Sequence, residues 1–327
     1  MLNLSITRDF GRSVKGQGAG LLLGGSGSDE VHSRGSMPWN RAKAAKCREE
    51  LCWSPAPPAG SAWLPRRNWQ QWVRASPSPV ADRTAQAAAE EIRKESGGRV
   101  DVFTCDLSSQ ADVRRLAGEI LAVLPRIDVL VNNVGGYWNT RHVTADGLEQ
   151  TFALNHLAPF LLTNLLLARL RESSSARVVT VSSNAHASGR IDFDDLQGAN
   201  SYSGARAYSQ SKLANVLFTY ELARKLEGSR VTANVLHPGI VSTSFGTEDP
   251  GAAQRVFVPL LRPLMQRAEA GAATSVRLAS ASELEAVSGT YFSRGKVRRS
   301  SRRSYDQRAA AHLWAISAAL TRLSDNR

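Results

Sequence analysis

Cysteine and long apolar runs are both scarce in this sequence of 327 residues. The three cysteines are too few for a disulfide framework, and no second pair of Cys or His residues completes a zinc site with Cys47 and Cys52. No run of about eighteen or more apolar residues occurs, so we predict no transmembrane segment. The apolar residues near Gly20 are too few for a secretory signal and follow the acidic Asp9. These absences predict a reducing, cytoplasmic location and no metal site.

Acidic residues are outnumbered, and the formal net charge is +12. Residues 1–80 carry eleven Lys and Arg against five Asp and Glu, and Arg294–Arg308 carries seven against one, which together account for the whole excess. A nucleic-acid-binding domain places such cations on a folded face beside groups that stack on or read bases. We interpret the two segments instead as a solvated leader and a solvated surface loop. A basic nucleic-acid-associated protein is therefore the less favoured alternative, and we predict no nucleic-acid partner.

Regular patterning is absent from residues 1–80, which hold seven of the thirteen prolines and five of the seven tryptophans. Stretches such as Trp53–Gly60 and Ser76–Pro79 cannot form interior helix or central strand, because proline lacks the backbone N–H that both need. We therefore predict two regions. Residues 1–81 form an atypical leader, either disordered or translated in a shifted reading frame, and residues 82–327 form a folded domain.

Helical and strand patterns alternate after Asp82. Amphipathic spacing predicts helices over Thr84–Ser96, Ala111–Leu124, Glu149–Arg171, Ala205–Glu227 and Glu269–Ser280. Short apolar runs predict strands over Arg99–Thr104, Ile127–Val131, Arg177–Ser182, Val231–Leu236 and Gly289–Phe292. Strands that alternate with helices of ten or more residues form βαβ units, and apolar strands are covered on both faces. The sequence therefore predicts an α/β fold with a doubly wound, Rossmann-like parallel sheet.

Tyr208 and Lys212 are spaced i, i+4 within one predicted helix, so their side chains lie on one face about 5–6 Å apart. A neighbouring ammonium group favours the phenolate, which lowers the pKa of a tyrosine and makes it a usable general acid and base. A single Tyr-x-x-x-Lys pattern more often belongs to an ordinary surface helix. Its meaning therefore depends on what the neighbouring segments carry.

Polar residues follow several predicted strands, at the edge where ligands bind to an open α/β sheet. Ser183 ends one strand, where its hydroxyl could hydrogen-bond a substrate carbonyl or could simply belong to a turn. Asn132–Gly135, Cys105–Leu107 and His237–Thr243 follow other strands in the same way. His186 lies three residues after Ser183, but no Gly-x-Ser-x-Gly motif surrounds this serine, which disfavours a Ser/His hydrolase.

The ordered set of motifs resembles the short-chain dehydrogenase/reductase family over residues 82–323. The motifs that carry the resemblance are Asn132-Asn-Val-Gly135, Asn155, Ser183, Tyr208-x-x-x-Lys212 and Pro238-Gly239. Three longer phrases are similar to the retinol-dehydrogenase-like branch of that family. They are Leu154-Asn-His-Leu-Ala-Pro-Phe160, Val181-Ser-Ser-Asn-Ala-His186 and Tyr208-Ser-Gln-Ser-Lys-Leu-Ala-Asn215.

This resemblance implies roles for individual residues. Tyr208 would act as acid and base, while Lys212 would lower its pKa and hold the nicotinamide ribose. Ser183 would orient the substrate, and Asn155 would hold a water in the proton relay. The implied cofactor-binding positions are Asp106, Leu107, Asn132, Val134, Gly135, Tyr208, Lys212, Pro238, Gly239, Val241 and Thr243.

The resemblance also implies reversible hydride transfer between NADP(H), or NAD(H), and an alcohol or carbonyl compound. Arg83 is the candidate contact for the 2′-phosphate that distinguishes NADP. The apolar stretches Val256–Leu261 and Pro263–Met265 fall where the family places its substrate-covering loop, although a helix packed on the sheet would show the same composition. We expect a hydrophobic substrate such as a retinoid, a steroid or a lipid aldehyde. Homodimers or homotetramers are also implied.

One family motif is missing. A Thr-Gly-x-x-x-Gly-x-Gly turn after the first strand normally cradles the pyrophosphate, and the glycines near Gly18 follow no apolar strand. A shifted reading frame from Arg48 onward can encode Gly-Arg-Thr-Val-Leu-Val-Thr-Gly-Ala-Thr-Ser-Gly-Ile-Gly-Leu-Ala, which is a strand and the missing turn. Without that turn, we expect this chain to bind NAD(P)H poorly or not at all. A catalytically impaired relative, or a mistranslated product, is therefore the main alternative function.

Overall fold

The structure, a computed structural model, describes residues 2–7, 72–75, 79–133, 135–239, 249 and 268–323. Three of the cofactor-binding positions predicted from the sequence, Val134, Val241 and Thr243, lie outside the described residues. The apolar stretches Val256–Leu261 and Pro263–Met265 also lie outside them.

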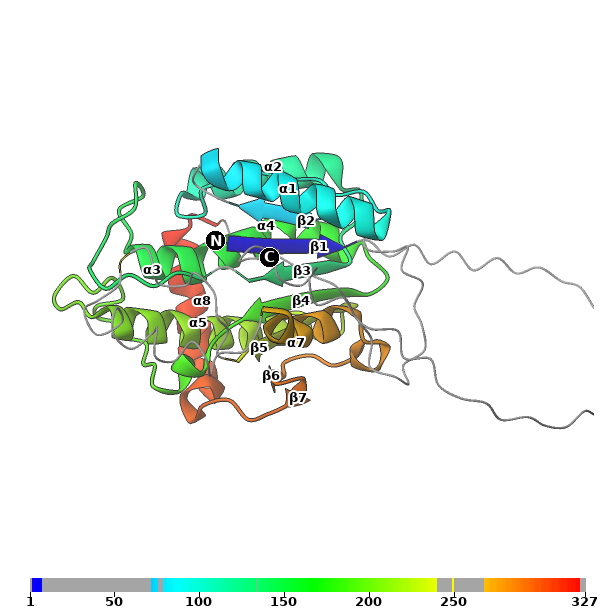
Figure 1. The fold of residues 1–327 in the computed structure, drawn as a ribbon. Helices are drawn as coiled ribbons and strands as arrows, with labels where there is room; N and C mark the ends of the chain where they lie inside the picture. Colours follow the sequence, from blue (N-terminus) through cyan, green and yellow to red (C-terminus); the bar gives the residue numbers. More distant parts are fainter. Residues whose placement is uncertain are drawn as a thin grey trace, which may run out of the picture.

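Seven strands of the described residues form one sheet in the order β2-β1-β3-β4-β5-β6-β7 (Figure 1). The strands are β1 (Leu2–Thr7), β2 (Trp72–Ala75), β3 (Val129–Asn132), β4 (Ala176–Val181), β5 (Val231–His237), β6 (Tyr291–Ser293) and β7 (Lys296–Val297). The four strands from β3 to β6 are parallel. This half of the sheet confirms the predicted α/β fold.

The sheet also contains antiparallel strands at both ends of its parallel part. β1 pairs antiparallel with both β3 and β2, and β7 turns back antiparallel on β6. Leu4 lies opposite Asn132 and Thr7 lies opposite Val129, so β1 runs toward the amino end of β3. The leader therefore contributes two strands, and its first one lies beside the strand that bears the Asn132 motif.

The segment Arg99–Thr104 was predicted as a strand and is irregular instead. No strand of the described residues pairs with it. Two of its backbone carbonyls accept from side chains: Arg93 Nε donates to Val100 O at 3.2 Å, and Arg115 Nη2 donates to Thr104 O at 2.9 Å. Arginine side chains thus satisfy two groups that a strand ladder would otherwise satisfy.

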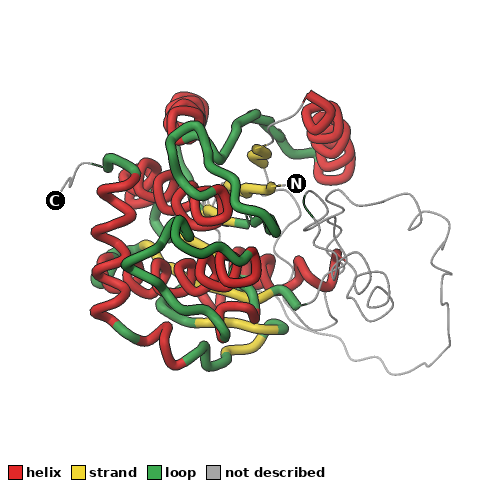
Figure 2. The backbone as a smooth tube through the Cα atoms, turned by 90° about the vertical axis from the view of Figure 1, so that its left-hand side faces the viewer, coloured by secondary structure: helices red, strands yellow, loops and turns green. Residues whose placement is uncertain are grey.

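Helices cover both faces of the sheet (Figures 1 and 2). They are α1 (Pro79–Ser96), α2 (Gln110–Val123), α3 (Gln150–Phe152), α4 (Ala158–Arg171), α5 (Gly204–Lys225), α7 (Ala268–Ser280) and α8 (Gln307–Leu320). Leu130 and Val178 pack with α2, α4 and α5, whereas Val129 and Val179 pack with α7 on the opposite face. This alternation along each strand buries both faces of the sheet, as a doubly wound fold requires.

The predicted helix over Glu149–Arg171 contains a π-helical turn, η1 (Ala153–Leu157), between α3 and α4. By length and composition, Gln150–Arg171 is the one helix of the described part of the chain that could cross a membrane. However, 78% of its most apolar window is buried inside the fold. The apolar side chains of this helix therefore build the core beside the sheet.

Helix α8 was not predicted from the sequence. Its Trp314 ring contacts Phe160 of α4 and Phe218 of α5, with ring centroids 5.0 and 5.8 Å apart. Ser317 Oγ lies 2.8 Å from Nε2 of the buried His156 in η1. The last described helix is thereby fastened to the helices that carry the predicted catalytic residues.

Candidate active site

Helix α5 brings Tyr208 and Lys212 together, as their spacing predicts. The Lys212 Nζ atom lies 5.8 Å from the centroid of the Tyr208 ring. Ser211 Oγ donates to the Tyr208 carbonyl at 2.8 Å, and Ser182 Oγ donates to the Lys212 carbonyl at 2.8 Å. The second bond ties α5 to the end of β4, so helix and sheet hold the two side chains in a fixed relation.

Lys212 is almost fully buried, with 3% of its surface exposed. Its Nζ donates to the carbonyl of Val181, the last residue of β4, at 3.3 Å. Burial lowers the pKa of Lys212 to about 8, because a low-polarity surrounding disfavours the charged form. Below that pH the site therefore holds a buried positive charge beside the Tyr208 ring.

Ser183 follows β4 directly and precedes the short helix η2 (Asn184–Ala187). Its side chain hydrogen-bonds the hydroxyl of Tyr208, which counteracts part of a rise in the pKa of Tyr208. Burial is the larger effect and raises that pKa. Desolvation of the phenolate therefore dominates the pKa of Tyr208, and the expected lowering by Lys212 stays a prediction.

Asn155 lies in η1 and is fully buried. Its Nδ2 donates to Gly136 O and to Ser211 Oγ, both at 2.9 Å, and its Oδ1 accepts from Gly136 N at 2.7 Å. The amide thus joins the loop after β3 to α5. Both ends of the side chain are occupied, and the implied role of Asn155 in holding a water stays a prediction. A π-turn at this residue fits the frequent placement of such turns at functional sites.

Tyr137 is a neighbour of the site that the sequence analysis missed. Its ring meets that of Tyr208 edge to face, with centroids 5.9 Å apart. Tyr137 lies in the loop after β3, so the contact depends on β3 and β4 ending at the same edge of the sheet. Only its place two residues after Gly135 could have drawn attention to it.

Two histidines support the loops around Ser183. His186 Nδ1 lies 2.6 Å from the backbone carbonyl of Ser183, and His237 Nδ1 accepts from Asn184 N at 3.3 Å. Burial lowers the pKa of His237 to about 4, so this ring is neutral near pH 7 and can accept the bond. The His186 ring faces the serine backbone rather than its hydroxyl, which argues further against a Ser/His hydrolase.

Several predicted cofactor positions lie at the same edge of the sheet. Asn132 ends β3, and its Nδ2 donates to Thr163 Oγ1 at 2.9 Å. Gly135 follows in the loop, while Pro238 and Gly239 follow β5. Gly239 has φ = 101°, a conformation that side chains disfavour. These positions lie where the strand order predicts a ligand.

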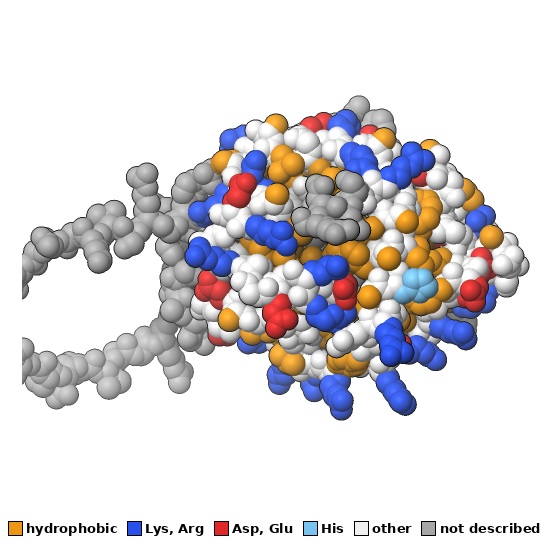
Figure 3. All heavy atoms as spheres, turned by 180° about the vertical axis from the view of Figure 1, so that it is seen from behind, with side chains coloured by type: hydrophobic (Ala, Val, Ile, Leu, Met, Phe, Trp, Pro, Cys, Tyr) orange, Lys and Arg blue, Asp and Glu red, His pale blue; other side chains and the backbone are white. Residues whose placement is uncertain are grey.

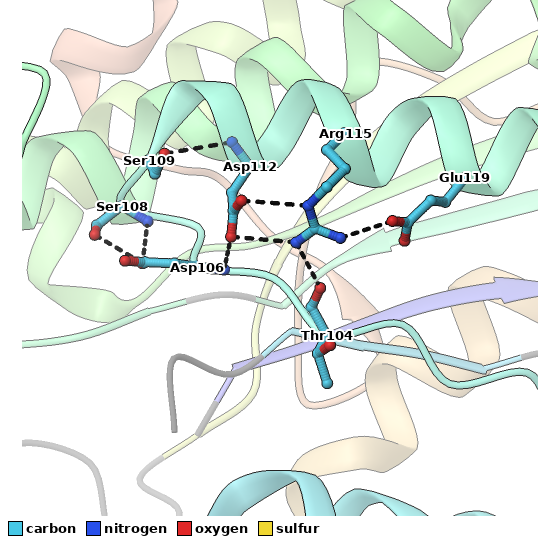
Figure 4. Close-up of polar contacts among 7 residues, drawn as sticks. All are labelled: Thr104, Asp106, Ser108, Ser109, Asp112, Arg115 and Glu119. Atoms are coloured by element: carbon cyan, nitrogen blue, oxygen red, sulfur yellow. Dashed lines mark hydrogen bonds and ion pairs between the residues drawn. The ribbon is translucent and has the colours of Figure 1, made fainter. Parts of the chain in front are cut away.

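Asp106 and Leu107 have different local roles, and Figure 4 shows the contacts of Asp106. Asp106 Oδ1 accepts from Ser108 N at 2.9 Å and from Ser108 Oγ at 2.7 Å, and the backbone N–H of Asp106 donates to Asp112 Oδ2 at 2.9 Å. Leu107 is buried in the core. The Asp106 carboxylate therefore shapes its own loop before helix α2, and the Leu107 side chain belongs to the core.

The described residues fit one end of an NAD(P) cofactor and not the other. Lys212 and Tyr208 are the residues that would hold a ribose and a nicotinamide, and Pro238 and Gly239 follow β5 at the same edge. The strand beside β3, however, is the antiparallel β1, whose carboxyl end lies at the opposite edge of the sheet. No glycine turn between a strand and a helix N-terminus lies beside Asn132 among the described residues. Likewise, no cluster of described side chains could hold a metal ion.

Comparison with known proteins identifies the class. The model of the short chain dehydrogenase family matches residues 78–252, which is more than half of the chain. The chain belongs to this family of NAD(P)-dependent oxidoreductases, in agreement with its doubly wound fold and with the grouping of Ser183, Tyr208 and Lys212.

The relatives place it in the retinol-dehydrogenase-like branch. It is 45% identical to human retinol dehydrogenase 14 over 67% of this chain and 66% of that protein. It is 42% identical to human retinol dehydrogenase 13, over 73% and 74% respectively, and 40% identical to human polyprenol dehydrogenase, over 75% and 76%. Among solved structures, it resembles an uncharacterized protein from Mycobacterium paratuberculosis (36% identity, TM-score 0.60, 76% of this chain and 83% of that one). A metagenomic blue fluorescent protein in complex with NADPH is more distant (25% identity, TM-score 0.53, 68% and 84%).

Proposed function

We propose that the domain after the leader is built for reversible hydride transfer between NADP(H) and an alcohol or carbonyl group, with Tyr208 as acid and base. The observation that carries this proposal is the hydrogen bond between the Ser183 side chain and the Tyr208 hydroxyl, with the buried Lys212 beside the ring. NADP(H) supplies or accepts the hydride when bound. The protein residues handle the proton and orient the substrate.

Each side chain has one task in this proposal. The Ser183 hydroxyl donates to the substrate oxygen and holds it near the Tyr208 hydroxyl. Tyr208 then gives a proton to that oxygen in reduction and removes one in oxidation. The cation of Lys212 stabilises the phenolate that forms, which offsets the raised pKa of the buried ring.

The proposed substrate is a hydrophobic alcohol or carbonyl compound. Relatives whose names include retinol and polyprenol support this class, since both are apolar alcohols. NADP rather than NAD is proposed with Arg83 as the contact for the 2′-phosphate. A cytoplasmic location and a homodimer or homotetramer also stay proposals.

A second candidate function is a catalytically impaired member of the family. The observation that favours it is the antiparallel β1 beside β3, together with the lack of a glycine turn among the described residues. Such a chain would keep the catalytic grouping and yet bind NAD(P)H weakly.

Calorimetric titration of the full chain with NADPH and with NADH separates the two candidates. We expect binding weaker than micromolar for both cofactors, because the pyrophosphate loses its backbone donors. Micromolar binding, followed by turnover of an apolar aldehyde that Tyr208→Phe abolishes, would instead establish an active enzyme. A Tyr220→Phe variant on the same helix is the matched control.

A further inference from the structure

Seven exposed cations lie within fifteen residues of sequence, from the turn after β6 to the first turn of α8. This basic edge consists of Arg294, Lys296, Arg298, Arg299, Arg302, Arg303 and Arg308. Within the described part of the chain, none of the seven forms an ion pair. The one acid of the same stretch, Asp306, caps helix α8 by accepting from Ala309 N at 3.0 Å. The basic edge therefore presents nearly unopposed positive charge.

Figure 3 shows Lys and Arg side chains gathered along the lower border of the molecule, the end at which Figure 1 places β6 and β7. Two of the three exposed large hydrophobic side chains of the described residues also belong to this stretch: Val297 is 61% exposed and Tyr305 is 49% exposed. Cations beside exposed apolar side chains are the combination that binds an anionic lipid surface, where charges meet headgroups and apolar groups enter the headgroup boundary.

The basic edge is held rigidly. Arg294 and Gly295 both have positive φ, 52° and 70°, so the turn between β6 and β7 is a tight hairpin in which an arginine takes a position that usually favours Gly or Asn. Gly295 N donates to Thr274 Oγ1 at 2.9 Å, and Arg277 Nη1 donates to Gly295 O at 2.6 Å. Helix α7 thus fixes the hairpin that projects Arg294.

The same stretch is joined to the loop of Ser183. Ser301 N donates to His186 Nε2 at 3.1 Å, and the other nitrogen of that ring lies 2.6 Å from the Ser183 carbonyl. Arg303 Nη1 donates to Gly189 O at 3.2 Å. Whatever binds the basic edge is therefore brought close to the loop that carries Ser183.

We propose that the basic edge is a docking surface for an anionic lipid membrane, with Val297 and Tyr305 entering the headgroup region. A nucleic acid fits less well, because single strands are bound by several stacked aromatic rings, whereas Tyr305 is the one exposed aromatic ring in this stretch. An apolar substrate dissolved in the bilayer would then be delivered beside the site, and this consequence rests on the proposed function.

The test measures sedimentation of the full chain with vesicles of phosphatidylcholine alone and of an equimolar mixture with phosphatidylserine. We expect binding to the mixed vesicles that weakens at high salt. The triple variant Arg298→Gln, Arg299→Gln, Arg302→Gln should lose roughly a hundredfold in affinity, at about fivefold for each cation. The control triple Lys94→Gln, Arg171→Gln, Arg230→Gln removes the same charge from exposed positions elsewhere and should bind as the parent does. The basic leader is common to all of these chains.

A second pair of variants tests the apolar contact. Val297→Asp should weaken binding to mixed vesicles several-fold more than one added negative charge does by itself. Val143→Asp, at the other exposed valine, adds the same charge and should not show this larger loss. Equal losses in both triples, equal binding to neutral vesicles, or no vesicle binding would overturn the proposal. Binding of an RNA oligonucleotide through the basic edge, without vesicle binding, would overturn it in favour of a nucleic-acid partner. Circular dichroism confirms that each variant is folded, and no step needs cofactor or turnover, so failure here is separate from failure of the proposed function.

Discussion

The two halves of the sheet differ in the direction of their strands. The four strands from β3 to β6 are parallel, because the chain between one strand and the next returns to the edge at which the strands begin. On the other side of β3, strands from the leader pair antiparallel with β3 and with each other. The first half carries the grouping of Ser183, Tyr208 and Lys212, while the second half has no glycine turn among its described residues. The two halves therefore differ in how closely they match the expected fold, and the proposed proton-transfer residues lie in the half that matches it.

Restoring the phosphate turn would test this comparison most strongly. Replacing Arg48–Trp63 by the sixteen residues of the shifted frame should give a parallel first strand and a glycine turn. We expect NADPH affinity to rise from weak or undetectable to micromolar, a binding free energy of about −8 kcal/mol. Calorimetry measures it, and the same replacement with alanine at the three glycines of the turn serves as control. A repaired chain that still fails to bind would show that the defect lies elsewhere.

The next prediction concerns Tyr208, whose helix packs on the parallel half of the sheet. In the repaired chain, Tyr208→Phe should reduce turnover by about 10²–10⁴-fold, because the hydroxyl transfers the proton. NADPH affinity should change little by comparison. Tyr220→Phe, on the same helix, should leave turnover near the parent value. Steady-state kinetics with an apolar aldehyde would measure turnover. Full activity of Tyr208→Phe would show that Tyr208 is not the acid and base.

The free energy of unfolding should depend most on the core beside the parallel half of the sheet. Leu130→Ala opens a space in the fully buried core between the sheet and α2, and it should cost about 2–5 kcal/mol in the free energy of unfolding. Urea denaturation measures this cost. Leu121→Ala, at a partly buried position of α2, should cost less, and a reversed order would mean that the core does not centre on β3.

The smallest expected effect comes from Lys212, and it has the opposite sign. Burial lowers its pKa to about 8 from an ordinary value of 10.5, so folding favours the neutral amine. The penalty is complete below pH 8 and disappears as the pH rises toward 10.5, where the unfolded lysine also loses its proton. Lys212→Met should therefore raise the free energy of unfolding at pH 7 by about 1–3 kcal/mol while it abolishes turnover.

Urea denaturation of parent and variant at pH 7 and at pH 10 tests this prediction. The advantage of the methionine variant should shrink at the higher pH, since the parent then gains stability as Lys212 becomes neutral. A constant difference across this range would show that the charge of Lys212 carries no penalty.

Local patterns were enough to predict the parallel half. The strands near Val129 and Val178 and the helix of Tyr208 are specified by apolar periodicity, and the structure shows them within a few residues of the predicted bounds. The grouping of Ser183 with Tyr208 also followed from spacing, because neighbouring parallel strands end at one edge.

Other features depend on partners far away in the sequence. Arg99–Thr104 has the composition of a strand, but no strand of the described residues pairs with it, and arginine side chains bind two of its carbonyls. Helix α8 follows the stretch that was interpreted as a surface loop, and no helix was predicted there. The pKa of Tyr208 depends on how deeply the fold buries the ring, which spacing does not reveal.

The bonds of Asn155 have a mechanical consequence. By holding both backbone groups of Gly136 and the hydroxyl of Ser211, one amide couples the loop after β3 to α5. We therefore expect the loop bearing Tyr137 and the helix bearing Tyr208 to move together. The amide hydrogen of Gly136 should accordingly exchange with solvent at the slow rate of the surrounding core rather than at that of a surface loop.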